Sequence, residues 1–135
     1  MISLLLVADS GTTMQALTTR LGSVVGVEIA AYASGAAPIA AIVAATRPDV
    51  ILVDEMPHTP RALMRIAEAT AAFPTVKVVG MTERVEGGWA PDALRAGACA
   101  VVPRDIAPGG LALVLAEVAA DRGAGPAPVI ERGAA

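Results

Sequence analysis

The sequence contains almost no cysteine and very few aromatic residues. Cys99 is the single cysteine among 135 residues, so an internal disulfide and a cysteine-based zinc cluster are both excluded. Aromatic residues make up 2% of the chain, one each of Phe, Trp and Tyr. The hydrophobic content of 55% must therefore come from aliphatic residues, which suits strands backed by closely packed helices. This composition excludes a disordered chain, and the length predicts one folded domain.

A basic surface is also missing. Ten Lys and Arg residues stand against thirteen Asp and Glu residues, for a formal net charge of −3. Direct binding of nucleic acid by this segment is not expected, because domains that bind nucleic acid usually carry a basic stripe. No Lys or Arg precedes the first apolar run, which argues against a secretory signal. The uncharged residues 29–46 include glycine and proline, and they fit a strand, a turn and a helix better than a membrane span. We expect a cytoplasmic protein that contacts no membrane.

The motifs of common catalytic and nucleotide-binding sites are absent from the sequence. There is no Gly-x-x-x-x-Gly-Lys loop to bind phosphates, and no Gly-x-Ser-x-Gly turn or Cys/His pair for nucleophilic catalysis. His58 is the sole histidine and lies in a proline-bounded loop, where we interpret it as a solvated residue. We therefore expect that the chain is not an enzyme and has no catalytic residues.

What the sequence does contain is a series of short apolar runs that alternate with helical patterns. The run Val50-Ile51-Leu52-Val53 is typical of a strand buried on both faces of a parallel sheet. A run of the same form ends at Ala8. Residues 25–32 carry a glutamate and are expected near an edge of the sheet. Ser34-Gly35 is expected to begin a helix that has Pro38 in its first turn. Strands are predicted over 1–8, 25–32, 50–53, 76–81 and 99–102, and helices over about 14–22, 34–47, 61–72, 91–96 and 108–120.

Five strands alternating with five helices predict an α/β domain with right-handed crossovers and a parallel sheet covered on both faces. The folded domain is expected to span residues 1–122. After Arg122 the composition shifts to Gly, Ala and Pro. Residues 123–135 are therefore predicted to be a linker or a disordered tail.

Polar side chains follow four of the predicted strands. Asp9 follows the first strand and Asp54 the third, while Thr82 and Arg104 follow the fourth and fifth. Open α/β sheets carry their chemistry at the carboxyl ends of the strands. We therefore expect these four side chains to converge around one pocket at one edge of the sheet.

In this order the residues resemble the receiver domain of two-component response regulators, particularly the receivers of LuxR-type (NarL/FixJ-like) transcription regulators. The resemblance covers about Ile2 to Arg122 and implies a doubly wound, flavodoxin-like sheet with strand order 2-1-3-4-5. The matching segments are Leu5-Leu6-Val7-Ala8-Asp9, Arg47-Pro48-Asp49-Val50-Ile51-Leu52-Val53-Asp54, Thr82, Ala96-Gly97-Ala98 and Val101-Val102-Pro103-Arg104-Asp105.

The resemblance also implies roles. Asp54 matches the phospho-acceptor, and Asp9 and Asp54, together with the backbone carbonyl of Met56, match the Mg²⁺ ligands. Thr82 and Arg104 match the positions that bind the phosphoryl group. The implied partners are a sensor histidine kinase and a second copy of the chain. DNA is expected only through an output domain that is not visible in this sequence.

The sequence departs from the family at several positions. Ala8 replaces one of two adjacent acids, Arg104 replaces a lysine, and Val101 replaces an aromatic switch residue. Met56 also follows Glu55 directly, which shortens the usual spacing by one. Losing a carboxylate predicts weak or absent Mg²⁺ binding. Arg104 can instead clamp Asp54 in a bidentate pair that imitates the ionic contact of the activated state.

The favoured interpretation is an atypical receiver in which Asp54 controls dimerisation or an attached DNA-binding domain. Two others stay open: a dimerisation or interaction module that works without phosphorylation, and a small-ligand sensor that uses the same strand-end cleft. Simpler roles also stay open for single residues. Asp54 can cap the next loop, Thr82 can cap the following segment, and Arg104 can be a solvated surface residue.

Overall fold

The structure is a computed structural model that describes residues 1–9, 11–56 and 59–120. The predicted tail over 123–135, the domain boundary at Arg122 and the loop residue His58 lie outside the described residues. Ten elements alternate along the described chain, as the sequence predicted. The strands are β1 Ile2–Ala8, β2 Val27–Ser34, β3 Val50–Asp54, β4 Lys77–Thr82 and β5 Ala100–Pro103. The helices are α1 Thr12–Leu21, α2 Ala40–Thr46, α3 Thr59–Ala72, α4 Trp89–Ala96 and α5 Pro108–Ala120.

The five strands form one parallel sheet in the order β2-β1-β3-β4-β5, which confirms the predicted topology. Strand β2 lies at an edge, as its mixed composition indicated. Strand β3 lies at the centre, between β1 and β4, and all five of its residues are buried. Asp54 is the last residue of this central strand, so its backbone is fixed by the most buried part of the sheet.

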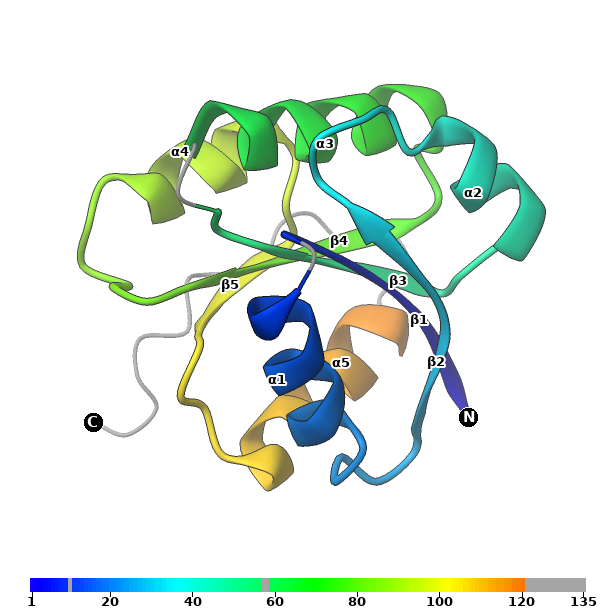
Figure 1. Cartoon of the computed structure of the whole chain (residues 1–135), viewed down its shortest axis with the longest axis vertical. Helices are drawn as coiled ribbons and strands as arrows, with labels where there is room; N and C mark the ends of the chain where they lie inside the picture. The colour runs from blue at the N-terminus through cyan, green and yellow to red at the C-terminus, as the bar shows by residue number, and fades with distance from the viewer. Residues whose placement is uncertain (10, 57–58, 121–135) are drawn as a thin grey trace.

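Helices cover both faces of the sheet (Figure 1). Helices α1 and α5 lie on one face, and α2, α3 and α4 lie on the other. Successive residues of β3 point to opposite faces: Leu52 belongs to the same core cluster as Leu17 and Leu115, whereas Ile51 belongs to the cluster of Ile66. A strand packed on both sides must be apolar at nearly every position, which explains the uninterrupted run before Asp54.

The predicted start of the second helix is wrong. Residue Ser34 still pairs with Ala8 in the sheet, and α2 begins only at Ala40. Proline disfavours the helical conformation of the residue before it, so Pro38 keeps the preceding segment out of the helix. The backbone N–H groups of Ile39 and Ala40 instead donate to the carboxylate of Glu68 in α3. A side chain from another helix therefore sets where α2 begins.

Candidate functional site

A cleft of about 390 Å³ opens at the carboxyl ends of the strands. Three of the four side chains expected to converge at this edge line it: Asp9 after β1, Asp54 at the end of β3 and Arg104 after β5. The remaining lining residues are Thr13, Glu55, Met56, Glu83, Arg84, Gly87, Gly88 and Trp89. The parallel arrangement brings these segments together because every strand ends at the same edge of the sheet.

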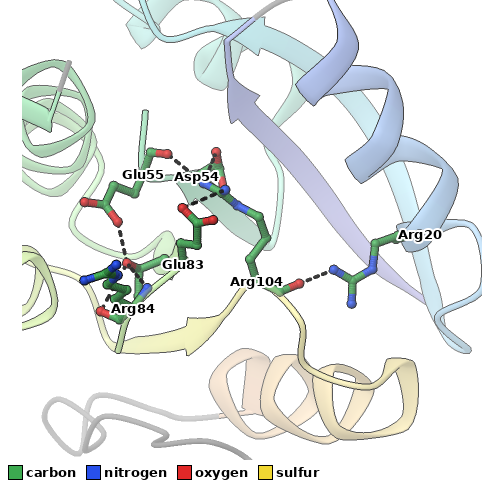
Figure 2. Close-up of polar contacts among 7 residues, drawn as sticks. Arg20, Asp54, Glu55, Glu83, Arg84 and Arg104 are labelled. Atoms are coloured by element: carbon green, nitrogen blue, oxygen red, sulfur yellow. Dashed lines mark hydrogen bonds and ion pairs between the residues drawn. The ribbon is translucent and has the colours of Figure 1, made fainter. Parts of the chain in front are cut away.

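Asp54 and Arg104 form a bidentate ion pair in this cleft (Figure 2). Arg104 Nε donates to one carboxylate oxygen of Asp54 at 3.0 Å, and its Nη2 donates to the other at 3.1 Å. The same Nη2 also donates to the backbone carbonyl of Glu55 at 3.0 Å. The Asp54 side chain is only 2% exposed and that of Arg104 is 32% exposed. Arg104 is thus a partly buried counter-ion, and the interpretation as a solvated surface arginine does not describe it.

The acidity of Asp54 reflects this setting. Burial raises the pKa of its carboxyl from 3.8 to about 6, against the opposing effect of the Arg104 guanidinium and its hydrogen bonds. The neighbouring carboxylates of Glu55 and Asp9 raise the pKa further. Asp54 is therefore ionised at neutral pH and takes up a proton in mildly acidic solution.

Thr82 lies beside this pair without lining the cleft itself. It is fully buried, and its hydroxyl donates to the carboxylate of Glu55. The same hydroxyl oxygen accepts a hydrogen bond from the backbone N–H of Arg84 at 3.2 Å. This contact is the local cap of the following segment that was the alternative interpretation of Thr82. The backbone N–H of Glu55 donates to the carbonyl of Met81 at 2.7 Å, so Glu55 continues the contact between β3 and β4 beyond Asp54. Glu55 is thus the residue that connects Thr82 to the cleft.

Sequence reasoning missed several residues of the site. Glu55 and Glu83 directly follow the residues that end β3 and β4, and Arg84 comes one position later. The same strand-end rule applied one or two positions further could have found them. The Glu83 carboxylate approaches Arg104 Nη1 at 4.0 Å but is 77% exposed, so it contributes little. Arg20 contacts the backbone at Arg104 from α1, and nothing in the local sequence indicates it.

The donor set in this arrangement does not fit the Mg²⁺ ion that the resemblance implies. Both carboxylate oxygens of Asp54 already accept hydrogen bonds from Arg104. Among the described residues, no group of three or more His, Cys, Asp and Glu side chains could hold a metal ion. Met56, whose backbone carbonyl was the third expected ligand, is among the residues that line the cleft, and its side chain is buried against Gly35. The positive charge beside Asp54 is supplied by Arg104, and weak or absent Mg²⁺ binding stays a prediction.

Over the part of the chain that the structure describes, no helix is long and apolar enough to cross a membrane. No protein-family model matches the sequence. A curated relative, protein-glutamate methylesterase/protein-glutamine glutaminase 2 of Cereibacter sphaeroides, is 33% identical over 141 residues, which cover 93% of this chain and 38% of the relative. A second curated relative from the same species, named for the group 2 operon, matches to the same extent. The chain therefore spans less than two fifths of the length of these curated relatives.

Solved structures resemble the whole described domain. The signal receiver domain of the response regulator NarL from Mycobacterium tuberculosis matches with a TM-score of 0.69 and 21% identity, over 90% of this chain and 98% of that one. A LuxR-family two-component response regulator from an Aurantimonas species matches with a TM-score of 0.74 and 18% identity, over 90% of this chain and 86% of that one. Identities of this size establish the fold. The chain therefore has the receiver-domain fold of two-component response regulators, and its structural neighbours include the LuxR-family receivers that the sequence resembles.

Proposed function

We propose that this chain is an atypical receiver in two-component signalling, with Asp54 as its phospho-acceptor. Arg104 is the cation that binds both oxygens of Asp54 and so limits their reaction with a phosphodonor. The observation that carries the proposal is the bidentate contact between Arg104 and both oxygens of Asp54. A carboxylate at the end of a central strand, in an open cleft and with a raised pKa, has the features of a functional residue.

Arg104 controls access to Asp54 in this proposal. A carboxylate oxygen attacks the phosphorus of a phosphodonor, and the bond from phosphorus to the leaving group breaks with its electron pair. An oxygen that is held by a guanidinium is a weaker nucleophile, because its lone pairs are engaged in charge-assisted hydrogen bonds. Arg104 must release at least one oxygen before the transfer. Its planar fork then matches the oxygens of a phosphoryl group.

Thr82 and Glu55 form the second part of the proposed switch. The Thr82 hydroxyl is held by the Glu55 carboxylate, so it must leave this partner to bond a phosphoryl group on Asp54. Both phosphoryl-binding side chains, Thr82 and Arg104, are thus paired with carboxylates of the chain itself. Phosphorylation would exchange these internal partners, and the backbone after β4 and β5 would move with them. The proposed partners are a sensor histidine kinase, a second copy of the chain in a homodimer, and DNA that is bound through an output domain.

The acceptor role is tested by treating the protein with a small phosphodonor, with and without Mg²⁺, and recording the intact mass. The wild-type protein should gain one phosphoryl group slowly and Asp54→Asn should gain none. Arg104→Lys should react faster than the wild type, because a lysine cannot hold both oxygens of Asp54. Trp89 is the only tryptophan and lines the cleft, so its fluorescence offers a second readout. Equal labelling of wild type and Asp54→Asn would remove Asp54 from the proposal.

A second candidate function is a dimerisation or interaction module that needs no phosphate. The observation in its favour is that Arg104 and Thr82 are already bonded to carboxylates, as they would be to a phosphoryl group. If neither the wild type nor Arg104→Lys is labelled, while the wild type is a constant dimer by analytical ultracentrifugation, this second function replaces the first.

A further inference from the structure

Arg104 lies in the loop between β5 and α5, and the backbone of this loop is held from two sides. The Arg104 N–H donates to the carbonyl of Thr82 at 2.7 Å, which ties the start of the loop to β4. Within the loop, the N–H of Ile106 donates to the carbonyl of Pro103 at 3.1 Å. The carbonyls of Arg104 and Ile106 take no part in these two contacts, and both accept hydrogen bonds from another element.

Arg20 in the last turn of α1 supplies those donors. Its Nη1 donates to the carbonyl of Arg104, and its Nη2 donates to the carbonyl of Ile106 at 2.8 Å. Figure 2 shows Arg104 between its two partners, with its side chain directed to Asp54 and its carbonyl directed to Arg20. A guanidinium is planar and its two Nη atoms have a fixed separation, so together they fix the spacing of the two carbonyls.

We propose that Arg20 is a positioning residue, which holds the backbone of Arg104 where its guanidinium can reach both oxygens of Asp54. The inference rests on the proposed role of the Asp54–Arg104 pair and adds the element that orients it. Hydrogen bonds at both the N–H and the carbonyl of Arg104 restrict its backbone on both sides. A bidentate contact depends on where the backbone places the guanidinium, so this restriction favours the contact with Asp54. Helix α1 is thereby connected to the cleft through the backbone of Arg104.

Arg20 could also act on Asp54 simply as a nearby positive charge, and Arg20→Lys separates the two effects. Lysine keeps the charge but carries one compact ammonium group, which cannot span the two carbonyls as the guanidinium does. If Arg20 acts through position, Arg20→Lys and Arg20→Gln should behave alike. If it acts through charge alone, only Arg20→Gln should differ from the wild type.

The readout is the ¹⁵N–¹H NMR signal of Arg104 Nε–H, because this hydrogen is bonded to Asp54 in the pair. Its exchange with solvent is slow while the pair is closed. We expect exchange about tenfold faster in both Arg20 variants, the change that about 1.4 kcal/mol of weakening produces. Arg95→Lys is the matched control, since Arg95 is an exposed arginine that pairs with Asp92 on α4, and its replacement should leave the signal unchanged. Urea unfolding of each variant checks that the fold is intact.

Two outcomes would overturn different claims. If Asp54→Asn speeds the exchange at Arg104 Nε–H while Arg20→Lys leaves it at the wild-type rate, Arg20 has no positioning role and the Asp54–Arg104 pair stands. If Asp54→Asn leaves the exchange unchanged, the Asp54–Arg104 pair is absent in solution. The proposal that Arg104 limits the reaction of Asp54 then fails as well.

Discussion

Replacing Arg104 with alanine is expected to lower the free energy of unfolding by about 2–4 kcal/mol at neutral pH. The substitution leaves the buried Asp54 carboxyl without its counter-ion, so it must either stay charged in a poorly solvated site or take up a proton. Breaking a buried ion pair in this way typically costs about 3–5 kcal/mol. The expected value is somewhat smaller because the Arg104 side chain is 32% exposed and water can partly replace it. Urea unfolding, followed by circular dichroism, measures the effect.

Two companion variants make this result specific. Asp54→Asn in the Arg104→Ala background should recover part of the lost stability, because a neutral amide does not need a cation. Arg95→Ala removes an arginine from an exposed pair with Asp92 and should change stability by less than about 1 kcal/mol. If Arg104→Ala is no more destabilising than Arg95→Ala, the contact with Asp54 contributes nothing to the folded state.

The second large effect is a pH dependence of stability that is specific to Asp54. The pKa of its carboxyl is about 6 in the folded protein, against an ordinary value of 3.8, so the folded state keeps this proton over a range in which the unfolded state releases it. The folded state binds more protons there, and the free energy of unfolding therefore falls as the pH rises from about 4 to about 6. A shift of about two units corresponds to roughly 3 kcal/mol.

This dependence is measured as the difference in unfolding free energy between the wild type and Asp54→Asn at several pH values. The difference cancels the contributions that the two proteins share, so that only the contribution of Asp54 remains. Wild-type stability should decline relative to Asp54→Asn up to about pH 6 and then level off. A difference that stays constant across this range would show that Asp54 titrates alike in the folded and unfolded states.

The fold could be predicted because its signals are local and repeated. The apolar run before Asp54 identified a strand buried on both faces, and the alternation of strands and helices predicted a parallel sheet. The strand order followed from the resemblance to receiver domains, and the sheet has that order. Asp9, Asp54 and Arg104 could be placed in one cleft because strand ends in a parallel sheet share an edge. The bidentate contact between Arg104 and Asp54 could also be predicted, because receiver domains usually have a lysine at this position and an arginine can hold both oxygens of a carboxylate.

The features that the sequence did not reveal depend on contacts between distant elements. Helix α2 begins at Ala40 because Glu68 of α3 accepts hydrogen bonds from its first N–H groups, and neither partner signals the other along the chain. The contact of Thr82 with Glu55 likewise depends on how β3 and β4 end side by side. Arg20 contacts a loop more than eighty positions later, which only the folded structure brings within reach.

The presence of an arginine beside Asp54 changes the charge balance that the receiver resemblance implies. A divalent ion is exchangeable, whereas a guanidinium belongs to the chain and is always charged. The cleft thus carries its own counter-ion, and in the proposed mechanism phosphorylation of Asp54 must displace it. The departures from the family at positions 8 and 104 are consistent with each other in this respect. The first removes a carboxylate, and the second replaces a compact ammonium group with a guanidinium that can hold both oxygens of Asp54.

The most direct test of the Asp54–Arg104 pair is an NMR titration of the Asp54 carboxyl carbon in the wild type and in Arg104→Ala. We predict a midpoint near pH 6 for the wild type, and a higher midpoint for Arg104→Ala because the cation that favours the ionised form is gone. A midpoint at the ordinary value of 3.8 in both proteins would contradict a buried Asp54 that is paired with Arg104.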